Sequence, residues 1–303
     1  MKVLIITGGT SSERPVSLKS ARQVKKGLEE SNHQATLFDL KKGKEKLKET
    51  AKKFDVIFPV LHGEEGEGGT LQKLLADIGK PFVGGDPKGF KEGWYKISFK
   101  KFCNKNKILT APWKKVKSKI DMIKFGFPSV LKASNGGSSK EVIILKTEGD
   151  LKKADCQKLL KSNTDLFVER FLPGIEVTAA ILDNKALPLI EIVPPKGGWF
   201  DYKNKYSGAT KEITNAPSVN KSLTKSVQKM ALKIHQLLNL GSYSRIDFII
   251  FEGKPYVLEI NTIPGLTSES LFPKAAKAVG ISFPKLMDKL VKMAYEEKLS
   301  KTK

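Results

Sequence analysis

Arginine is scarce in this 303-residue chain: only four of its 54 basic residues are arginine, and the others are lysine. Arginine is the side chain that most often forms paired contacts to bases and phosphates in nucleic-acid interfaces. The lysines are spread over every segment, so the net charge of +22 predicts a lysine-rich surface and no specific nucleic-acid partner. A polyanion-binding protein is an alternative that rests on charge alone, and its binding would collapse with salt.

Cysteines and long apolar runs are also few. Cys103 and Cys156 have no metal-type spacing, which predicts free thiols in a reducing compartment rather than a disulfide scaffold. No apolar run approaches the roughly 18 residues of a membrane span, and the first run stops at Gly8-Gly9, too short for a signal peptide. We therefore expect a soluble, cytoplasmic protein with no membrane partner.

The first third of the chain alternates strand-like and helix-like segments. Strands are expected over 2–7, 35–40, 55–61 and 81–83, and helices over 16–30, 41–53 and 70–78. This alternation predicts an N-terminal α/β domain, residues 1–91, with a parallel sheet covered by helices on both faces. Ligands of such sheets bind beyond the carboxyl ends of the strands, where two Gly-rich loops occur here.

From residue 92 onward the pattern becomes that of an α+β protein in two lobes, 92–170 and 171–303. Helices are expected over 94–104, 223–240, 272–279 and 283–297. Strands are expected over 128–132, 142–145, 166–171, 176–182, 186–192, 246–251 and 256–260. The stretch 193–217 is expected to be irregular.

The segment RIDFIIFEGKPYVLEINTIPG, residues 245–265, indicates a metal site. Its two apolar strands flank a Gly-containing loop at 252–254, which predicts a hairpin. A three-residue loop would place Asp247 opposite Glu259, with Asn261 two residues further along the same face. Mg²⁺ prefers such oxygen ligands, so the hairpin predicts a magnesium–nucleotide site. The alternative is that these side chains are merely solvated.

Four further segments combine turn residues with polar side chains. TGGTSSERPVSLKS contains Glu13, a carboxylate at a helix start that would suit a ligand ammonium, and LHGEEGEGGTLQ contains His62, which could contact a substrate or only a neighbour. In LKASNGGSSKEV, Lys132 precedes a Gly-Ser loop that could wrap phosphates. VERFLPGIEV places Glu169 and Glu176 around a Pro-Gly corner that could meet a nucleoside. Together the segments predict ATP-dependent phosphoryl transfer to a second substrate.

These motifs, in this order and with TAPW, DYKNKY and LEINTIPGLTSESL, resemble those of the D-alanine–D-alanine ligases of the ATP-grasp superfamily over almost the whole chain. The resemblance implies an ATP-grasp fold over the two α+β lobes. It implies that ATP phosphorylates the carboxylate of one D-alanine and that the amine of a second attacks the acylphosphate. ADP, phosphate and D-alanyl-D-alanine for peptidoglycan synthesis would be the products. A homodimer and two Mg²⁺ ions, replaceable by Mn²⁺, are also implied.

The resemblance assigns a role to each matching residue. The two D-alanines and the reaction centre would be served by Glu13, His62, Lys205, Tyr206, Arg245, Gly265 and Ser270. ATP would be bound by Lys96, Lys132, Ser138, Ser139, Glu169, Leu172 and Glu176, and the metal ions by Asp247, Glu259 and Asn261. Tyr206 would join Glu13 and Ser138 in a closing hydrogen-bond network. Relatives that make D-alanyl-D-lactate typically lack this tyrosine, so the dipeptide product is favoured.

The chain departs from the family's usual pattern in three places. Lys140-Glu141 replace an apolar residue and a glycine in the phosphate loop, Ala133 replaces a proline, and Gly68 replaces an aspartate. The charged pair leaves open an ATP-grasp protein with impaired turnover, and a ligase that takes D-serine or D-lactate is the other alternative. The complete set of metal and phosphate residues favours the active D-alanine–D-alanine ligase.

Overall fold

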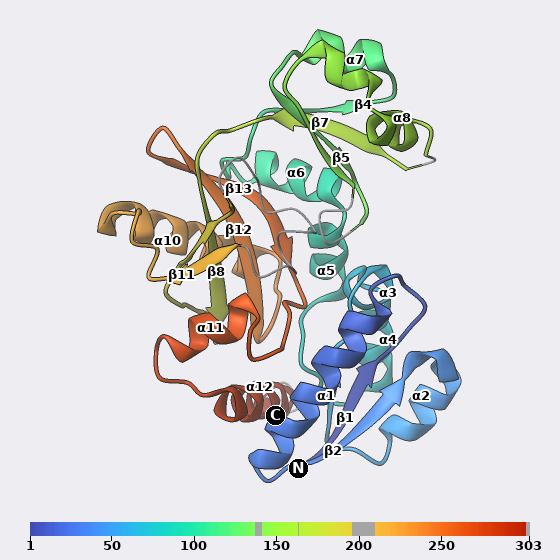
Figure 1. Cartoon of the computed structure of the whole chain (residues 1–303). Coiled ribbons are helices and arrows are strands. Elements are labelled where there is room, and N and C mark those ends of the chain that lie inside the picture. The colour runs from blue at the N-terminus through green and yellow to red at the C-terminus, as the bar shows by residue number, and fades with distance from the viewer. Residues whose placement is uncertain (137–140, 163, 196–209, 301–303) are drawn as a thin grey trace.

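The computed structural model describes residues 1–136, 141–162, 164–195 and 210–300, and its helices and strands are arranged around three separate sheets (Figure 1). No helix in these ranges combines the length and the apolar character that crossing a membrane requires. The mixed α/β architecture expected from the sequence is confirmed.

The N-terminal sheet is parallel, with the strand order β2–β1–β3. Its unit contains β1 (Lys2–Thr7), α1 (Arg14–Glu30), β2 (Gln34–Asp39), η1 (Leu40–Lys42), α2 (Lys44–Ala51), β3 (Val56–Pro59), α3 (Glu64–Glu67) and α4 (Thr70–Ile78). Val3 and Ile5 face α1, whereas Leu4 and Ile6 face α2 and α4, as alternation along a buried strand requires. The strand expected over 81–83 is only a single bridge between Ile57 and Phe82.

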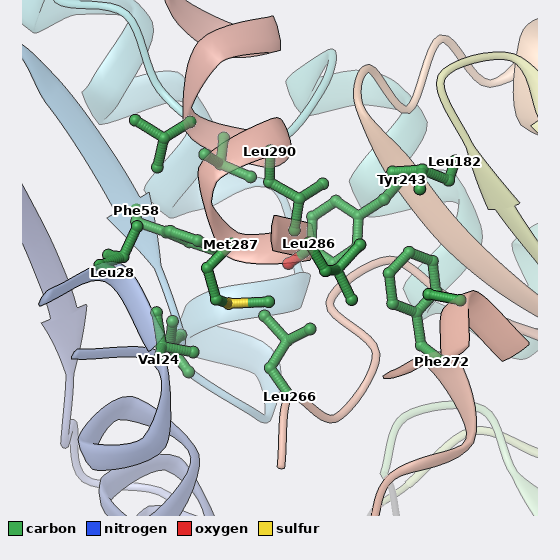
Figure 2. Packing of buried hydrophobic residues seen from close by; sticks show 14 of the residues in the cluster. Val24, Leu28, Phe58, Leu182, Tyr243, Leu266, Phe272, Leu286, Met287 and Leu290 are labelled. Atoms are coloured by element: carbon green, nitrogen blue, oxygen red, sulfur yellow. The ribbon is translucent and has the colours of Figure 1, made fainter. Parts of the chain in front are cut away.

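The last helix, α12 (Phe283–Ser300), packs against this N-terminal unit although it lies at the other end of the chain (Figures 1 and 2). Gly27 of α1 permits the close approach, because a Cβ there would lie 2.9 Å from the Phe283 ring. One apolar cluster joins the two ends of the chain; it includes Val24, Leu28, Phe58, Leu182, Tyr243, Leu266, Phe272, Leu286, Met287 and Leu290. The cluster ties the N-terminal sheet to the C-terminal sheet.

The central sheet is antiparallel, with the order β4–β7–β5–β6. Its unit contains α5 (Pro87–Trp94), α6 (Lys96–Lys105), β4 (Trp113–Val116), α7 (Lys119–Phe125), β5 (Ser129–Ala133), β6 (Val142–Leu145), η2 (Glu148–Lys152), α8 (Ala154–Leu160) and β7 (Leu166–Arg170). The helix expected over 94–104 is α6, which begins two residues later than expected because Tyr95, between α5 and α6, is extended (φ −79°, ψ 107°). This break starts α6 at Lys96, whose amide donates to the Ser134 carbonyl at 2.7 Å.

The C-terminal sheet has the order β11–β10–β8–β12–β13, with β9 paired to β8. Its unit contains β8 (Ile175–Leu182), β9 (Lys185–Ala186), β10 (Ile190–Val193), β11 (Lys211–Thr214), α10 (Lys221–Leu237), β12 (Tyr243–Phe251), β13 (Lys254–Asn261) and α11 (Leu271–Lys277). The expectation of irregular structure over 193–217 is wrong for β11, which pairs with β10. The strand expected over 186–192 is interrupted between β9 and β10.

Candidate active site

In the hairpin β12–β13, Asp247 lies directly opposite Glu259, as the sequence predicted. The turn and the strand register that produce this pairing differ from those expected. The loop has two residues, Glu252 and Gly253, both at positive φ, as tight hairpin turns require. A regular two-residue hairpin would place Leu258 opposite Asp247. A β-bulge between Asp247 and Phe248 shifts the register by one residue, so that Glu259 takes that place.

The face of β12 that points away from α10 changes from apolar to charged along the strand. Tyr243 packs against Phe272 at one end, while Arg245 and Asp247 follow at two-residue steps. Arg245 donates to both carboxylate oxygens of Asp247, from Nε at 3.0 Å and from Nη2 at 2.9 Å. Thr178 Oγ1 and Asn261 Nδ2 also donate to this carboxylate, at 2.5 and 3.0 Å. These hydrogen bonds fix the direction of the Arg245 side chain on β12, an interior strand of the sheet.

A cavity of about 690 Å³ lies where the N-terminal unit meets this charged face and the start of α6. Eight residues that the sequence singled out line it: Glu13, His62, Lys96, Arg245, Glu259, Asn261, Gly265 and Ser270. They come from segments up to about 250 positions apart in the chain. The cavity therefore collects the ammonium, phosphate and metal candidates into one space.

On the N-terminal side of the cavity, His62 is buried and lies near Glu13 and Arg245. Its backbone N–H donates to Ser17 Oγ at 2.9 Å, and its carbonyl accepts from Ser11 Oγ at 3.1 Å. Burial lowers the pKa of the imidazole, and Arg245 lowers it further against the opposing effect of Glu13. Nε2 of this ring is buried and has no hydrogen-bond partner among the described residues.

Glu67 is a cavity residue that the sequence analysis missed. Its side chain is 7% exposed, and its carboxyl accepts from the Gly63 N–H at 2.9 Å. Burial, followed by the charge of Glu13, raises the pKa of Glu67 to about 8. The single signal in the sequence was that Glu67 is the third glutamate in LHGEEGEGGTLQ, and nothing local distinguishes it from Glu64 and Glu65.

The raised pKa of Glu67 has a consequence for stability. Below about pH 4.5 the Glu67 carboxyl is protonated in both the folded and the unfolded protein, and its contribution to the free energy of unfolding is fully present. This contribution is lost as the pH rises through the folded-state pKa of about 8. Within this window, each pH unit lowers the free energy of unfolding by up to about 1.4 kcal/mol. We expect Glu67→Gln to remove this slope in urea unfolding at pH 5, 6.5 and 8. Glu148→Gln, at an exposed position, should leave it unchanged; a wild-type slope in Glu67→Gln would contradict the assignment.

On the phosphate side, Lys96 joins the glycine-rich loop to the hairpin. Its Nζ donates to the Gly136 carbonyl at 2.8 Å and lies 3.7 Å from Glu259 Oε2. The side chain is 14% exposed, so its charge is only partly screened by water. The ammonium lies between the start of the phosphate loop and the candidate metal ligand.

Lys132 lies beyond the cavity lining, in a buried cluster on the central sheet. Its Nζ lies 2.5 Å from Glu169 Oε1, and a second lysine, Lys100 of α6, contacts Glu169 Oε2. Burial alone would raise the pKa of Glu169, but the two ammonium groups lower it to about 2. Lys100 was also missed by the sequence analysis. Its signal was a lysine three residues after Ile97 and three before Cys103, on the buried face of α6.

The end of the cavity next to α11 is built from backbone and hydroxyl groups. Ser270 precedes α11, and its Oγ accepts from the Thr267 N–H at 3.2 Å. Gly265 lies so near that a Cβ there would be 2.9 Å from Ser270 Oγ. Glycine at position 265 therefore permits the close approach of the backbone to the serine hydroxyl.

The nucleoside candidates lie around the link between the central and C-terminal sheets. Leu172 is half-buried in that link, and Glu176 on β8 pairs with Ile249 on the same face of the sheet as Asp247. The positive charge of Lys132 is stabilised by Glu169, Glu259 and Glu176, which overcome the effect of burial and raise the pKa of Lys132. The lysine therefore faces carboxylates from both lobes.

Four residues of the predicted site lie outside the described residues, and so does one residue that departs from the family pattern. They are Ser138, Ser139, Lys205 and Tyr206, and the departure is Lys140. Glu141 and Ala133 are described and line a smaller hollow of about 240 Å³ next to the main cavity. The roles assigned to the four residues remain predictions.

The donor set on the hairpin fits a hard cation. Glu259 and Asn261 line the cavity and offer oxygen atoms, and Asn261 donates to Asp247 through nitrogen, which directs its carbonyl oxygen elsewhere. Each oxygen of Asp247 already accepts two hydrogen bonds, so Asp247 would bind a cation only by exchanging one of them. No group of three His, Cys, Asp or Glu side chains in the described ranges is arranged to hold a metal, so the asparagine is needed to complete the set.

Comparisons with known proteins agree over almost the whole chain. Family models described as D-ala D-ala ligase N-terminus and C-terminus match residues 39–85 and 96–292. D-alanine–D-alanine ligase A of Clostridium perfringens (strain 13 / Type A) is 38% identical over 298 residues, which cover 96% of this chain and 97% of that protein. The D-alanine–D-alanine ligase of Clostridium botulinum (strain Langeland) is 39% identical over 302 residues, or 98% and 99% of the two chains.

Among solved structures, the D-alanine–D-alanine ligase of Bacillus anthracis complexed with ATP superposes with a TM-score of 0.84. The two proteins are 29% identical, and the match covers 99% of each chain. The fold is therefore an ATP-grasp fold preceded by a parallel α/β unit, as the sequence predicted. With both family models and these relatives in agreement, the chain belongs to the D-alanine–D-alanine ligase family.

Proposed function

We propose that this protein joins two D-alanine molecules into D-alanyl-D-alanine for peptidoglycan synthesis, with ATP converted to ADP and phosphate. The observation that carries the proposal is the single cavity lined by Glu13, Lys96, Arg245, Glu259 and Ser270, which come from distant parts of the chain. Such convergence provides groups for an ammonium, phosphates and a carboxylate within one reaction space.

The first D-alanine binds with its ammonium at Glu13 and with neutral His62 beside it. Arg245, held by Asp247, presents its remaining N–H groups to the substrate carboxylate that receives the phosphoryl group. Lys96 and Lys132 neutralise the ATP phosphates during transfer. Because negative charge develops on the oxygens in this step, fixed donors in a site shielded from water stabilise it more than free solvent would.

The second D-alanine binds with its carboxylate at Ser270, assisted by Lys205, and its amine attacks the acylphosphate. Arg245 and the Gly265 N–H stabilise the oxyanion of the tetrahedral intermediate, and phosphate leaves. Glu169 and the backbone near Leu172 contact adenine, and Glu176 the ribose. Ser138 and Ser139 cover the phosphates, and Tyr206 closes the site together with Glu13.

Asp247, Glu259 and Asn261 would hold two Mg²⁺ ions, which when bound polarise the phosphates and neutralise their charge. Mn²⁺ offers the same preference for oxygen ligands. We also place the protein in the cytoplasm as a homodimer; the two buried cysteines, both unpaired, suit a reducing compartment. The domain boundaries at 91/92 and 170/171 are part of the same proposal.

Phosphate release with ATP, Mg²⁺ and D-alanine, with products identified by mass, tests the proposal. We expect phosphate and D-alanyl-D-alanine in equal amounts, and no release with L-alanine. Parallel reactions of D-alanine with D-serine or D-lactate measure the second-substrate preference. ATP binding without phosphate release from any substrate pair would contradict an active ligase and would direct attention to Lys140-Glu141.

A further inference from the structure

Lys100 is the most deeply buried cation next to the nucleotide region, with 1% of its surface exposed. It extends from α6 and contacts Glu169 Oε2, and its Nζ donates to Thr110 Oγ1 at 2.5 Å. Thr110 in turn donates to the Val257 carbonyl at 2.9 Å. Lys100 therefore links α6, the central sheet and the C-terminal hairpin at one point.

The cluster contains two lysines for one carboxylate, which packing alone does not explain. A buried ammonium is strongly disfavoured unless it is paired, and an apolar side chain would fill the same volume without that penalty. Burial lowers the pKa of Lys100, against the opposing effect of Glu169. The second cation is therefore not explained by the packing of this site.

The two lysines differ in what they face. Lys132 is influenced by Glu169, Glu259 and Glu176, and its side chain is 12% exposed. Lys100 is enclosed and contacts Glu169 and Thr110. Of the two ammonium groups, that of Lys132 can turn toward a ligand, while that of Lys100 stays in place.

We propose that Lys100 is a positioning residue for the nucleotide: it holds the Glu169 carboxylate in place while Lys132 turns to the ATP phosphates. This inference rests on the proposed function, in which Lys132 contacts phosphate and Glu169 contacts adenine. Without Lys100, Glu169 would be a buried carboxylate that loses its cation when ATP binds. Lys132 would then be retained by Glu169 and withheld from the phosphates.

Lys100→Met tests this, because methionine preserves the length of the side chain and removes the charge. We expect the Kd for ATP, measured by calorimetry, to rise at least tenfold, and the preference for ATP over GTP to fall. The KM for D-alanine should change less than twofold. Lys101→Met is the matched control, since Lys101 is the exposed neighbour on the same helix, and it should leave all these values unchanged.

A double-mutant cycle measures whether Lys100 acts on ATP affinity through Glu169. Glu169→Gln releases Lys132 from its ion pair, so the loss of ATP affinity in Lys100→Met/Glu169→Gln should be smaller than the product of the two single losses. If the loss of ATP affinity in the double variant equals the product of the two single losses, Lys100 and Glu169 are not coupled and the proposal is contradicted.

Thr110→Val keeps the inference testable if Lys100→Met does not fold, because it removes one hydrogen bond to Lys100 and leaves the charges intact. We expect a rise of about threefold in the Kd for ATP. An unchanged Kd and ATP-to-GTP ratio in a folded variant, with only the unfolding midpoint lowered, would overturn the proposal. Because binding is measured without turnover, a failed ligation assay would contradict the proposed reaction and leave this test intact.

Discussion

Replacing Glu259 by glutamine is expected to lower kcat for D-alanyl-D-alanine formation by about 10³-fold, equivalent to about 4 kcal/mol of transition-state stabilisation. The substitution removes an anionic oxygen that faces the cavity and keeps the size of the side chain. Stability should change little, because the side chain is 31% exposed and lies 3.7 Å from Lys96. Phosphate release over a series of Mg²⁺ concentrations measures the effect.

Glu252→Gln is the matched control for this prediction, because it makes the same substitution in the exposed turn of the same hairpin. It should leave kcat and the Mg²⁺ dependence as in the wild type. If Glu259→Gln retains kcat within threefold at saturating Mg²⁺, the assignment of the hairpin as the metal site is wrong.

Arg245→Lys is expected to lower kcat by about 10²-fold to 10³-fold with a smaller change in the KM for ATP. Lysine keeps the charge, but it cannot reproduce the two parallel hydrogen bonds that hold Arg245 against Asp247. The donors that should face the reacting carboxylate would then lose their fixed direction. Steady-state kinetics with saturating Mg²⁺ separate kcat from KM.

Arg170→Lys serves as the control for this second substitution, since Arg170 is exposed and makes one long hydrogen bond, 3.4 Å to the Phe127 carbonyl. Its kcat should match that of the wild type. Urea unfolding of Arg245→Lys shows whether the protein stays folded under assay conditions. A folded Arg245→Lys with wild-type kcat would show that this side chain does not act on the reacting group.

The pairing of Asp247 with Glu259 shows how a sequence-based argument can reach the right contact by the wrong geometry. Composition and alternation were sufficient to recognise two strands and a turn. The length of the turn depended on whether Lys254 belongs to the loop or to β13, and in the structure it pairs with Phe251. The bulge at Leu258 restores the predicted pairing, and a bulge leaves no local pattern that distinguishes it from a longer loop.

Lys100 and Glu67 show that the burial of a charged residue is difficult to predict from the sequence. A charged residue in a helix is normally interpreted as exposed, and the 3.6-residue period alone places Lys100 on the buried face of α6. Its partner, Glu169, lies on β7, about 70 positions away. A buried charge is recognisable only together with the partner that compensates it, and that partner is supplied by the tertiary structure.

The sequence alone determined the properties that depend on short spacing: the parallel order of strand and helix in the first unit, the hairpin, and the family motifs that identify an ATP-grasp ligase. Tertiary structure decided what depends on distant segments meeting. It placed α12 on the N-terminal sheet, joined Glu13 to Arg245 across one cavity, and surrounded Glu169 with two lysines. Local propensity acts over a few residues, whereas burial and charge compensation act through space, so only the folded chain shows which groups are neighbours.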